Sequence, residues 1–189
     1  MDPDVTGCER CPALVESRSR IVNGVGPADA DLLFVGEAPG QQEDERGEPF
    51  VGRSGDVLDE GLRAVGLSRA DIRITNCVRC RPPENRDPRL SELEHCRDHL
   101  YAELAAVDPA LVVALGKVPA EHLLDREVAV TGEAGAIHDA DLDTVRRVLV
   151  SVHPAATLYD RSQEETFAAA LRTAADYAGD GGQSTFGEF

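Results

Sequence analysis

Four short apolar runs rich in β-branched residues recur along the chain. They cover 31–36, 72–78, 110–116 and 145–152. Runs of this length and composition are typical of strands, and the nearly continuous apolar stretch in 110–116 suits a strand buried on both faces. The pattern therefore predicts four strands of a mainly parallel sheet.

Between and after these runs, apolar residues repeat at helical spacing. We expect helices over 54–65, over 91–107, after Lys117 and over 165–178. Ser91 and Glu94 have the spacing of a capping box, and the segment 127–141 resembles a small hairpin insertion. Alternating strands and helices predict an α/β fold, a three-layer α/β/α sandwich in one domain with a central, mainly parallel, four-stranded sheet.

The length of 189 residues suits one domain with its own core. We predict that this domain covers 1–178 and that a flexible, Gly-rich tail, "GDGGQSTFGEF", covers 179–189. No stretch approaches the roughly 20 apolar residues of a membrane-spanning helix, and the N-terminus lacks the basic and apolar regions of a secretory signal. We expect a cytoplasmic monomer that does not associate with membranes.

Charge changes this picture in two ways. The net charge is -16, and Lys117 is the only lysine among 19 basic residues. At about 1 M salt the Debye length is roughly 3 Å, so such a surface suits a host with a salty interior; the alternative is an ordinary acidic cytosolic enzyme. Within 73–91, by contrast, five arginines stand against two carboxylates. This basic segment could bind a phosphate backbone, or it could be a solvated loop with local ion pairs.

Three distinctive segments follow predicted strands. They are "GEAPGQQEDERGEPFVGRSG" (36–55), "NCVRCRPPENRDP" (76–88) and "HPAATL" (153–158). Ligands bind beyond the carboxyl ends of the strands in open parallel sheets, so we expect these segments to meet at one edge. The first segment has no lysine, unlike a phosphate-cradling loop, and its one aromatic ring is Phe50.

The five cysteines suggest a metal site, although a set that binds no metal is the alternative. Spacing alone selects Cys8, Cys11, Cys77 and Cys80, and mildly favours zinc over an iron–sulfur cluster. Position favours Cys8, Cys11, Cys80 and Cys96 instead, because Cys77 lies inside a predicted strand and suits a buried apolar role.

Together, the three segments and the cysteines closely resemble the family 4 uracil-DNA glycosylases over about residues 8–171. These are DNA-repair enzymes of bacteria and archaea with a [4Fe–4S] cluster. The resemblance implies that Cys8, Cys11, Cys80 and Cys96 hold the cluster and that Cys77 replaces an aliphatic residue. Ser54 stands where alanine is usual. A basic insert, "KRRIH", of a related branch is absent, and other branches lack the glutamate of "GEAPG".

The resemblance also implies an activity and roles for three residues. The enzyme would turn uracil out of DNA and hydrolyse its N-glycosidic bond without cutting the strand, leaving an abasic site. Phe50 would stack on uracil, Asn76 would read its polar edge, and His153 would donate a hydrogen bond to O2 as negative charge develops there. Considered singly, these residues could also be a core phenylalanine, a turn asparagine and a structural histidine.

Other site residues follow from the same resemblance. Glu37 would position water or offset the cationic sugar, or it would brace the loop through backbone N–H groups. Glu43 would shape the pocket rim near uracil C5. Gly36, Ala38 and Gly40 would allow the backbone to approach the base closely.

Partners are implied as well. Arg81, Arg86 and Arg89 are candidates for phosphate contacts, and the cluster would join the N-terminal segment to their loop. In the tail, Gln183, Phe186 and Phe189 partly match the peptide by which repair proteins dock on a sliding clamp, although one terminal aromatic is missing. Two rival functions are a non-catalytic iron–sulfur module that binds DNA or a polymerase, and a zinc hydrolase of small nucleosides.

Overall fold

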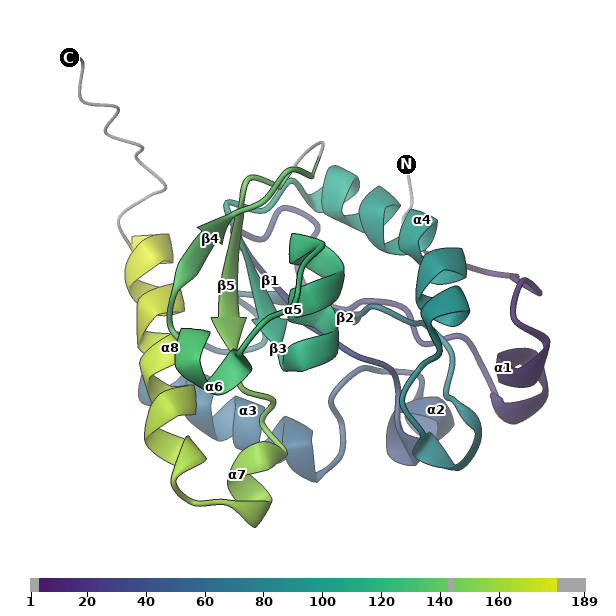
Figure 1. Cartoon of the computed structure of the whole chain (residues 1–189), viewed down its shortest axis with the longest axis horizontal. Helices are drawn as coiled ribbons and strands as arrows, with labels where there is room; N and C mark the ends of the chain where they lie inside the picture. Colours follow the sequence, from purple (N-terminus) through teal and green to yellow (C-terminus); the bar gives the residue numbers. More distant parts are fainter. Residues whose placement is uncertain (1–3, 143–144, 180–189) are drawn as a thin grey trace.

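A computed structural model describes residues 4–142 and 145–179, in which one sheet lies between two helical layers (Figure 1). Its strands are β1 (Leu32–Gly36), β2 (Arg73–Asn76), β3 (Leu111–Leu115), β4 (Ile137–Asp139) and β5 (Arg147–Ser151). The order is β2-β1-β3-β5-β4, with β1, β2, β3 and β5 mutually parallel and β4 antiparallel to β5.

The four predicted strands are therefore confirmed, with narrower bounds, but the predicted strand number is wrong. The fifth strand, β4, comes from the segment 127–141, which is not a separate hairpin: it forms the short helix α6 (Val130–Glu133) and then pairs with β5 at the sheet edge. The sequence of β4, Ile-His-Asp, is mostly exposed, so it lacks the buried apolar run that marks the other strands.

The four predicted helices are present. They are α3 (Arg53–Ala64), α4 (Leu90–Val107), α5 (Lys117–Leu124) and α8 (Gln163–Gly179). Shorter elements were not predicted: α1 (Pro12–Ser17), α2 (Gln41–Arg46), α7 (Ala156–Tyr159) and a 3₁₀ turn over Pro83–Asn85. The predicted capping box of α4 is wrong, because the helix begins at Leu90, and Glu92 accepts the N–H of Arg89 at 2.8 Å.

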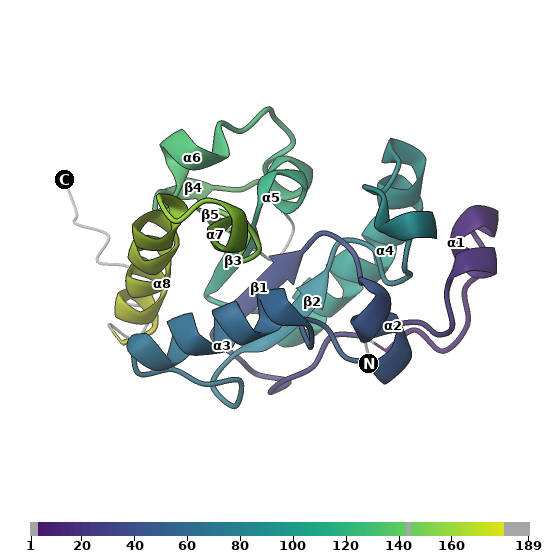
Figure 2. The same cartoon turned by 90° about the horizontal axis from the view of Figure 1, so that it is seen from below.

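Helices cover both faces of the sheet (Figure 2), and a separate apolar cluster lies on each face. On one face α4 and α5 pack through residues such as Leu100, Leu104 and Leu123. On the other, α3 and α8 pack through Leu62 and Leu171. This arrangement confirms the three-layer sandwich and leaves the carboxyl ends of β1, β2 and β5 free for a site.

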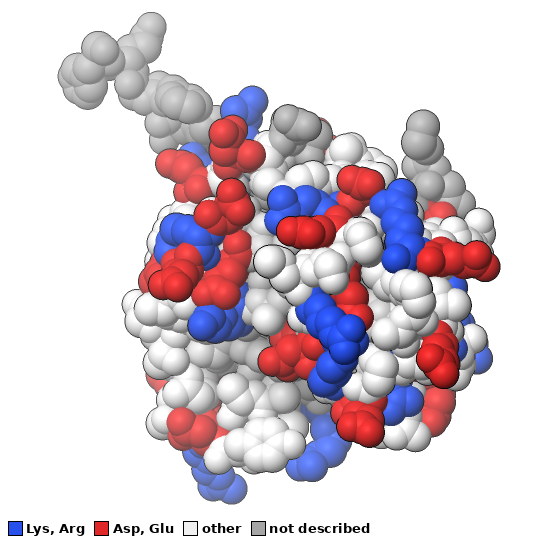
Figure 3. All heavy atoms as spheres, turned by 45° about the vertical axis from the view of Figure 1, so that its right-hand side comes forward, with Lys and Arg blue, Asp and Glu red and all other residues white. Residues whose placement is uncertain are grey.

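Charged groups also stabilise the interior. Glu103 on α4 is 1% exposed and pairs with two buried arginines, Arg73 on β2 and Arg79 beyond it. The five arginines of 73–91 are thus not a uniform basic surface. On the face shown in Figure 3, basic and acidic side chains are interspersed.

No helix in the described part of the chain is long and apolar enough to cross a bilayer.

The predicted boundary at residue 178 falls at the end of α8, which runs to Gly179. The proposed clamp residues Gln183, Phe186 and Phe189 lie outside the described residues.

Candidate active site

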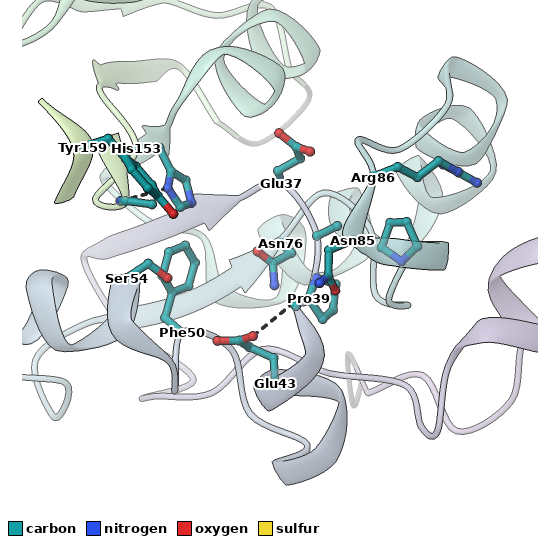
Figure 4. A pocket seen from close by; sticks show the side chains of 14 residues that line it. Glu37, Pro39, Glu43, Phe50, Ser54, Asn76, Asn85, Arg86, His153 and Tyr159 are labelled. Atoms are coloured by element: carbon teal, nitrogen blue, oxygen red, sulfur yellow. Dashed lines mark hydrogen bonds between the residues drawn. The ribbon is translucent and has the colours of Figure 1, made fainter. Parts of the chain in front are cut away.

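The three distinctive segments meet at the carboxyl edge of the sheet around a cavity of about 450 Å³ (Figure 4). Most of the predicted site residues line it, namely Glu37, Ala38, Gly40, Glu43, Phe50, Asn76, Arg86 and His153. The structure therefore brings together side chains from the ends of three parallel strands, as the topology led us to expect.

Gly36 and Asn76 end neighbouring strands in register, which places the Asn76 amide at the base of the cavity. Asn76 is 2% exposed, and its side chain has no hydrogen-bond partner among the described residues. A Cβ on Gly36 would lie 2.6 Å from two ring carbons of Phe50 and closer still to Asn76 Oδ1. Gly36 is thus the residue that lets the ring and the amide approach each other.

Phe50 is held in the wall of the cavity by an unusual backbone conformation. Its φ is +54°, in the left-handed region that non-glycine residues rarely adopt. The guanidinium of Arg69 stabilises this turn by donating hydrogen bonds to the carbonyls of Pro49 and Phe50. The Phe50 ring lies 5.7 Å from the ring of His153, centroid to centroid, at an interplanar angle of 30°.

His153 follows β5 and is neutral around pH 7. Burial lowers its pKa to about 4, against the opposing effect of the Glu43 carboxylate. Its Nδ1 accepts the N–H of Ala155 at 3.1 Å. In the neutral ring the proton is therefore on Nε2, which makes this nitrogen a hydrogen-bond donor.

The two predicted glutamates have different environments. The Glu43 carboxylate accepts the N–H groups of Gly40, Val51 and Gly52, each at 3.1 Å, so it braces both ends of the loop around α2. Glu37 has no backbone N–H partner among the described residues. Burial, together with the hydrogen-bonded carboxyl group of Asp87, raises the pKa of Glu37 to about 7.

Further residues line the cavity that were not singled out from the sequence as site residues. The polar or aromatic ones are Ser54, Asn85 and Tyr159, and Pro39, Pro82 and Ala155 complete the wall. Ser54 was noted only as a departure from alanine. Asn85 has a φ of +54°, and the Tyr159 side chain is 87% exposed. Their positions, inside or just after the distinctive segments, were the only indication in the sequence that they could belong to the site. Whether their side chains face the cavity depends on turns that the sequence pattern does not define.

Four of the five cysteines line a second, small cavity between α1 and α4. They are Cys8, Cys11, Cys80 and Cys96. Cys77 does not line it; this residue is fully buried in the core, one position after the end of β2 rather than inside the strand. Around the cavity, Arg18 donates hydrogen bonds to Cys80 Sγ at 3.0 Å and to the Cys8 carbonyl at 2.8 Å.

Four cysteines around one small cavity are a donor set that a [4Fe–4S] cluster or a zinc ion takes. In the described ranges, no three His, Cys, Asp or Glu groups are already gathered closely enough to hold one metal ion. The backbone N–H of Arg79 also donates to Cys96 Sγ at 3.4 Å, a contact typical of cluster thiolates.

The candidate DNA-contacting arginines differ in their availability. Arg86 forms a two-point ion pair with Glu92, at 2.7 and 2.8 Å, and Figure 4 shows its guanidinium pointing away from the other labelled side chains. Arg81 donates to the neutral Asn85 side chain at 2.8 Å. Among the described residues, neither Arg81 nor Arg89 forms an ion pair, although the charge of Arg89 contributes to the lowered pKa of Glu92.

Comparison with known proteins agrees with the fold and the site. The family model "Uracil DNA glycosylase superfamily" matches residues 23–175. A type-4 uracil-DNA glycosylase of Archaeoglobus fulgidus is 39% identical over 169 residues, 87% of this chain and 84% of the relative. Relatives with the same name from Thermotoga maritima and Pyrobaculum aerophilum are 39% and 37% identical, over 85% and 82% of this chain and 82% and 81% of their own lengths.

The fold and the strand-edge cavity are those of the uracil-DNA glycosylase superfamily. Within it, the chain belongs to the type-4 uracil-DNA glycosylases. The family expected from the sequence resemblance is confirmed.

Proposed function

We propose that this type-4 enzyme binds a uracil turned out of DNA in the cavity at the carboxyl ends of the strands, hydrolyses its N-glycosidic bond and leaves an abasic site. The observation that carries the proposal is the convergence of Phe50, Asn76 and His153, from three distant segments, on one cavity. Extruding a base costs a few kcal/mol of stacking, and an aromatic face returns roughly 1–3 kcal/mol of it. The Phe50 ring supplies that face.

Asn76 selects uracil. Its amide offers one acceptor to N3–H and one donor to O4, and it has no competing partner among the described residues. Cytosine reverses this pattern and leaves unsatisfied polar groups, each of which costs roughly 1–3 kcal/mol. Gly36, Ala38 and Gly40 keep the backbone beside the base free of bulk, and Glu43 fixes the rim through its three backbone contacts.

His153 acts on the departing base. As the glycosidic bond breaks, negative charge grows on uracil O2, and a donor aimed at that oxygen stabilises the transition state selectively. The neutral imidazole with its proton on Nε2 is such a donor, and a pKa of about 4 keeps it neutral over the physiological range. The sugar is left with cationic character and is attacked by water.

Glu37 prepares that water. A carboxyl group with a pKa of about 7 is a stronger proton acceptor, once ionised, than an ordinary glutamate. Its negative charge also offsets the cationic sugar. While protonated, Glu37 donates a hydrogen bond to the Asp87 carboxylate, and this bond is lost when Glu37 ionises. Glu43 carries the bracing role that was considered for Glu37.

The four clustered cysteines, Cys8, Cys11, Cys80 and Cys96, hold a [4Fe–4S] cluster. When bound, such a cluster supplies four iron–thiolate bonds that cross-link distant segments, and glycosidic hydrolysis needs no electron from it. It joins α1 to the start of α4, and Arg18 reinforces this link by contacting both Cys8 and Cys80. Cys77 takes no part.

DNA binds across the face that carries the cavity. Arg81 and Arg89 are available for phosphate contacts because neither forms an ion pair with a described carboxylate, although Arg89 also acts electrostatically on Glu92. Arg86 contributes once Glu92 releases it. The enzyme works as a monomer in the cytoplasm, where five cysteines without disulfides are stable. The tail residues Gln183, Phe186 and Phe189 dock on a sliding clamp, a proposal that rests on their sequence pattern.

A uracil-release assay over a salt series tests the central activity. The wild type should free uracil from a DNA oligonucleotide and leave matched cytosine and thymine oligonucleotides intact. His153→Gln should slow single-turnover release on the order of 10²- to 10³-fold, as loss of an oxyanion donor does. His138→Gln, on the edge strand β4, is the matched control and should keep the wild-type rate. Tight DNA binding without release at any salt concentration would favour the non-catalytic module instead.

A further inference from the structure

A second groove, also of about 450 Å³, continues from the uracil cavity. The two hollows share four lining residues, Glu43, Ser54, Ala155 and Tyr159. The groove then extends between α2, the start of α3 and α7, and none of Glu37, Asn76, Asn85 or Arg86 lines it. It therefore leads away from the side of the cavity that Asn85 and Arg86 line.

The charged groups in this groove leave one side chain available. Glu43 is occupied by three backbone N–H groups, and Glu45 accepts a hydrogen bond from Gln41 at 2.9 Å. Arg53, at the first position of α3, is exposed and has no hydrogen-bond or ion-pair partner among the described residues.

The walls of the groove suit a nucleotide as well. Tyr159 is 87% exposed and Leu158 is 37% exposed, so apolar surface borders the groove on the α7 side. The opposite wall is formed by the polar α2 residues Gln41 and Gln42. A cation for the backbone and an exposed aromatic ring for base stacking are features by which proteins hold single nucleic-acid strands.

We propose that this groove binds the DNA strand next to the extruded uracil, with Arg53 contacting a backbone phosphate. The proposal rests on uracil binding in the adjoining cavity, because the covalent chain then forces the neighbouring nucleotide to leave the cavity past one of its two rims. The 81–89 segment, of which Arg86 lines the cavity, serves one rim, and Arg53 serves the other. Holding the strand on both sides keeps the extruded nucleotide from returning to the stack.

The test compares two arginines of the same helix. Arg53 and Arg63 lie near opposite ends of α3, both are exposed, and neither has a carboxylate partner in the described part of the chain; Arg63 lies outside both hollows. We would measure the affinity of Arg53→Gln, Arg63→Gln and wild type for an oligonucleotide with a 2′-fluorinated deoxyuridine, which resists hydrolysis. The measurement is repeated over a salt series.

Each phosphate contact adds about 0.7–0.9 to the slope of log affinity against log salt. Arg53→Gln should make the fall of affinity with salt less steep by about that amount, and Arg63→Gln should leave the steepness unchanged. The difference in slope between Arg53→Gln and wild type should also disappear when the oligonucleotide is shortened on one particular side of the uracil. It should persist when the oligonucleotide is shortened on the other side.

Two results would overturn the groove proposal while leaving the proposed activity intact. One is a wild-type slope for Arg53→Gln in a protein whose parent releases uracil normally. The other is an equal loss of slope in both variants, which would indicate a general charge effect. Failure of the wild type to release uracil would instead refute the proposed function.

Discussion

Gly36→Ala tests the geometry of the site with the smallest possible change, one methyl group. In wild type, a Cβ at this position would lie 2.6 Å from Phe50 Cε2 and Cζ, and closer to Asn76 Oδ1. Favourable carbon contacts need about 3.5–4.0 Å, so the ring and the amide must each move by roughly 1 Å. The backbone of Gly36 is not in the left-handed region, so the clash alone is responsible.

Two magnitudes follow. Overpacking of this kind costs about 1–3 kcal/mol of stability. A misplacement of about 1 Å between reacting groups can lower the rate about 100-fold. We therefore expect Gly36→Ala to fold, with a modest loss in the free energy of unfolding, and to release uracil about two orders of magnitude more slowly.

The assay is single-turnover uracil release, with urea unfolding of the same preparation. Gly132→Ala is the matched control, because a Cβ on this α6 residue meets nothing within 4 Å, and it should match wild type in rate. A folded Gly36→Ala protein with the wild-type rate would refute the view that Phe50 and Asn76 must stand at their observed separation.

Three further predictions concern other groups. Cys77→Ala should keep the brown colour and iron content of the purified protein, whereas Cys96→Ala should lose both; visible absorbance and iron analysis decide, and the reverse outcome would refute the ligand set. With Glu37 acting as a carboxylate, single-turnover release should rise as the pH passes about 7 and this group loses its proton; the rise should be absent in Glu37→Gln, and its persistence there would assign the titration to another group. Glu103→Gln should reduce the free energy of unfolding in urea by about 3–5 kcal/mol, because two buried arginines lose their shared carboxylate; a cost below about 1 kcal/mol would show that the pairing contributes little.

The sequence predicted those parts of the fold that carry a long or fully buried pattern. The runs that became β1, β3 and β5 are apolar on both faces, and α3, α4 and α8 are long enough for helical spacing to be visible. Elements such as α2 and α7, of six and four residues, are too short to show that period. β4 was not predicted because none of its three residues is buried, so it shows no apolar run.

The site was predictable in position but not in its electrostatics. Strand topology alone indicated that three distant segments would meet, although the family resemblance supplied the roles. Counting charges along 73–91 overstated its basic surface, because the partner Glu103 of Arg73 and Arg79 lies on α4, 24 or more residues away. The bracing by Glu43 likewise depends on N–H groups as far as Gly52, which only the folded loop brings within reach.

The most direct test of the account is a crystal structure of the protein soaked with free uracil. We predict density for the base stacked on the Phe50 ring, with its N3–O4 edge on the Asn76 amide and O2 facing His153 Nε2. A base found elsewhere, or a cavity that stays empty at uracil concentrations that inhibit the enzyme, would contradict it.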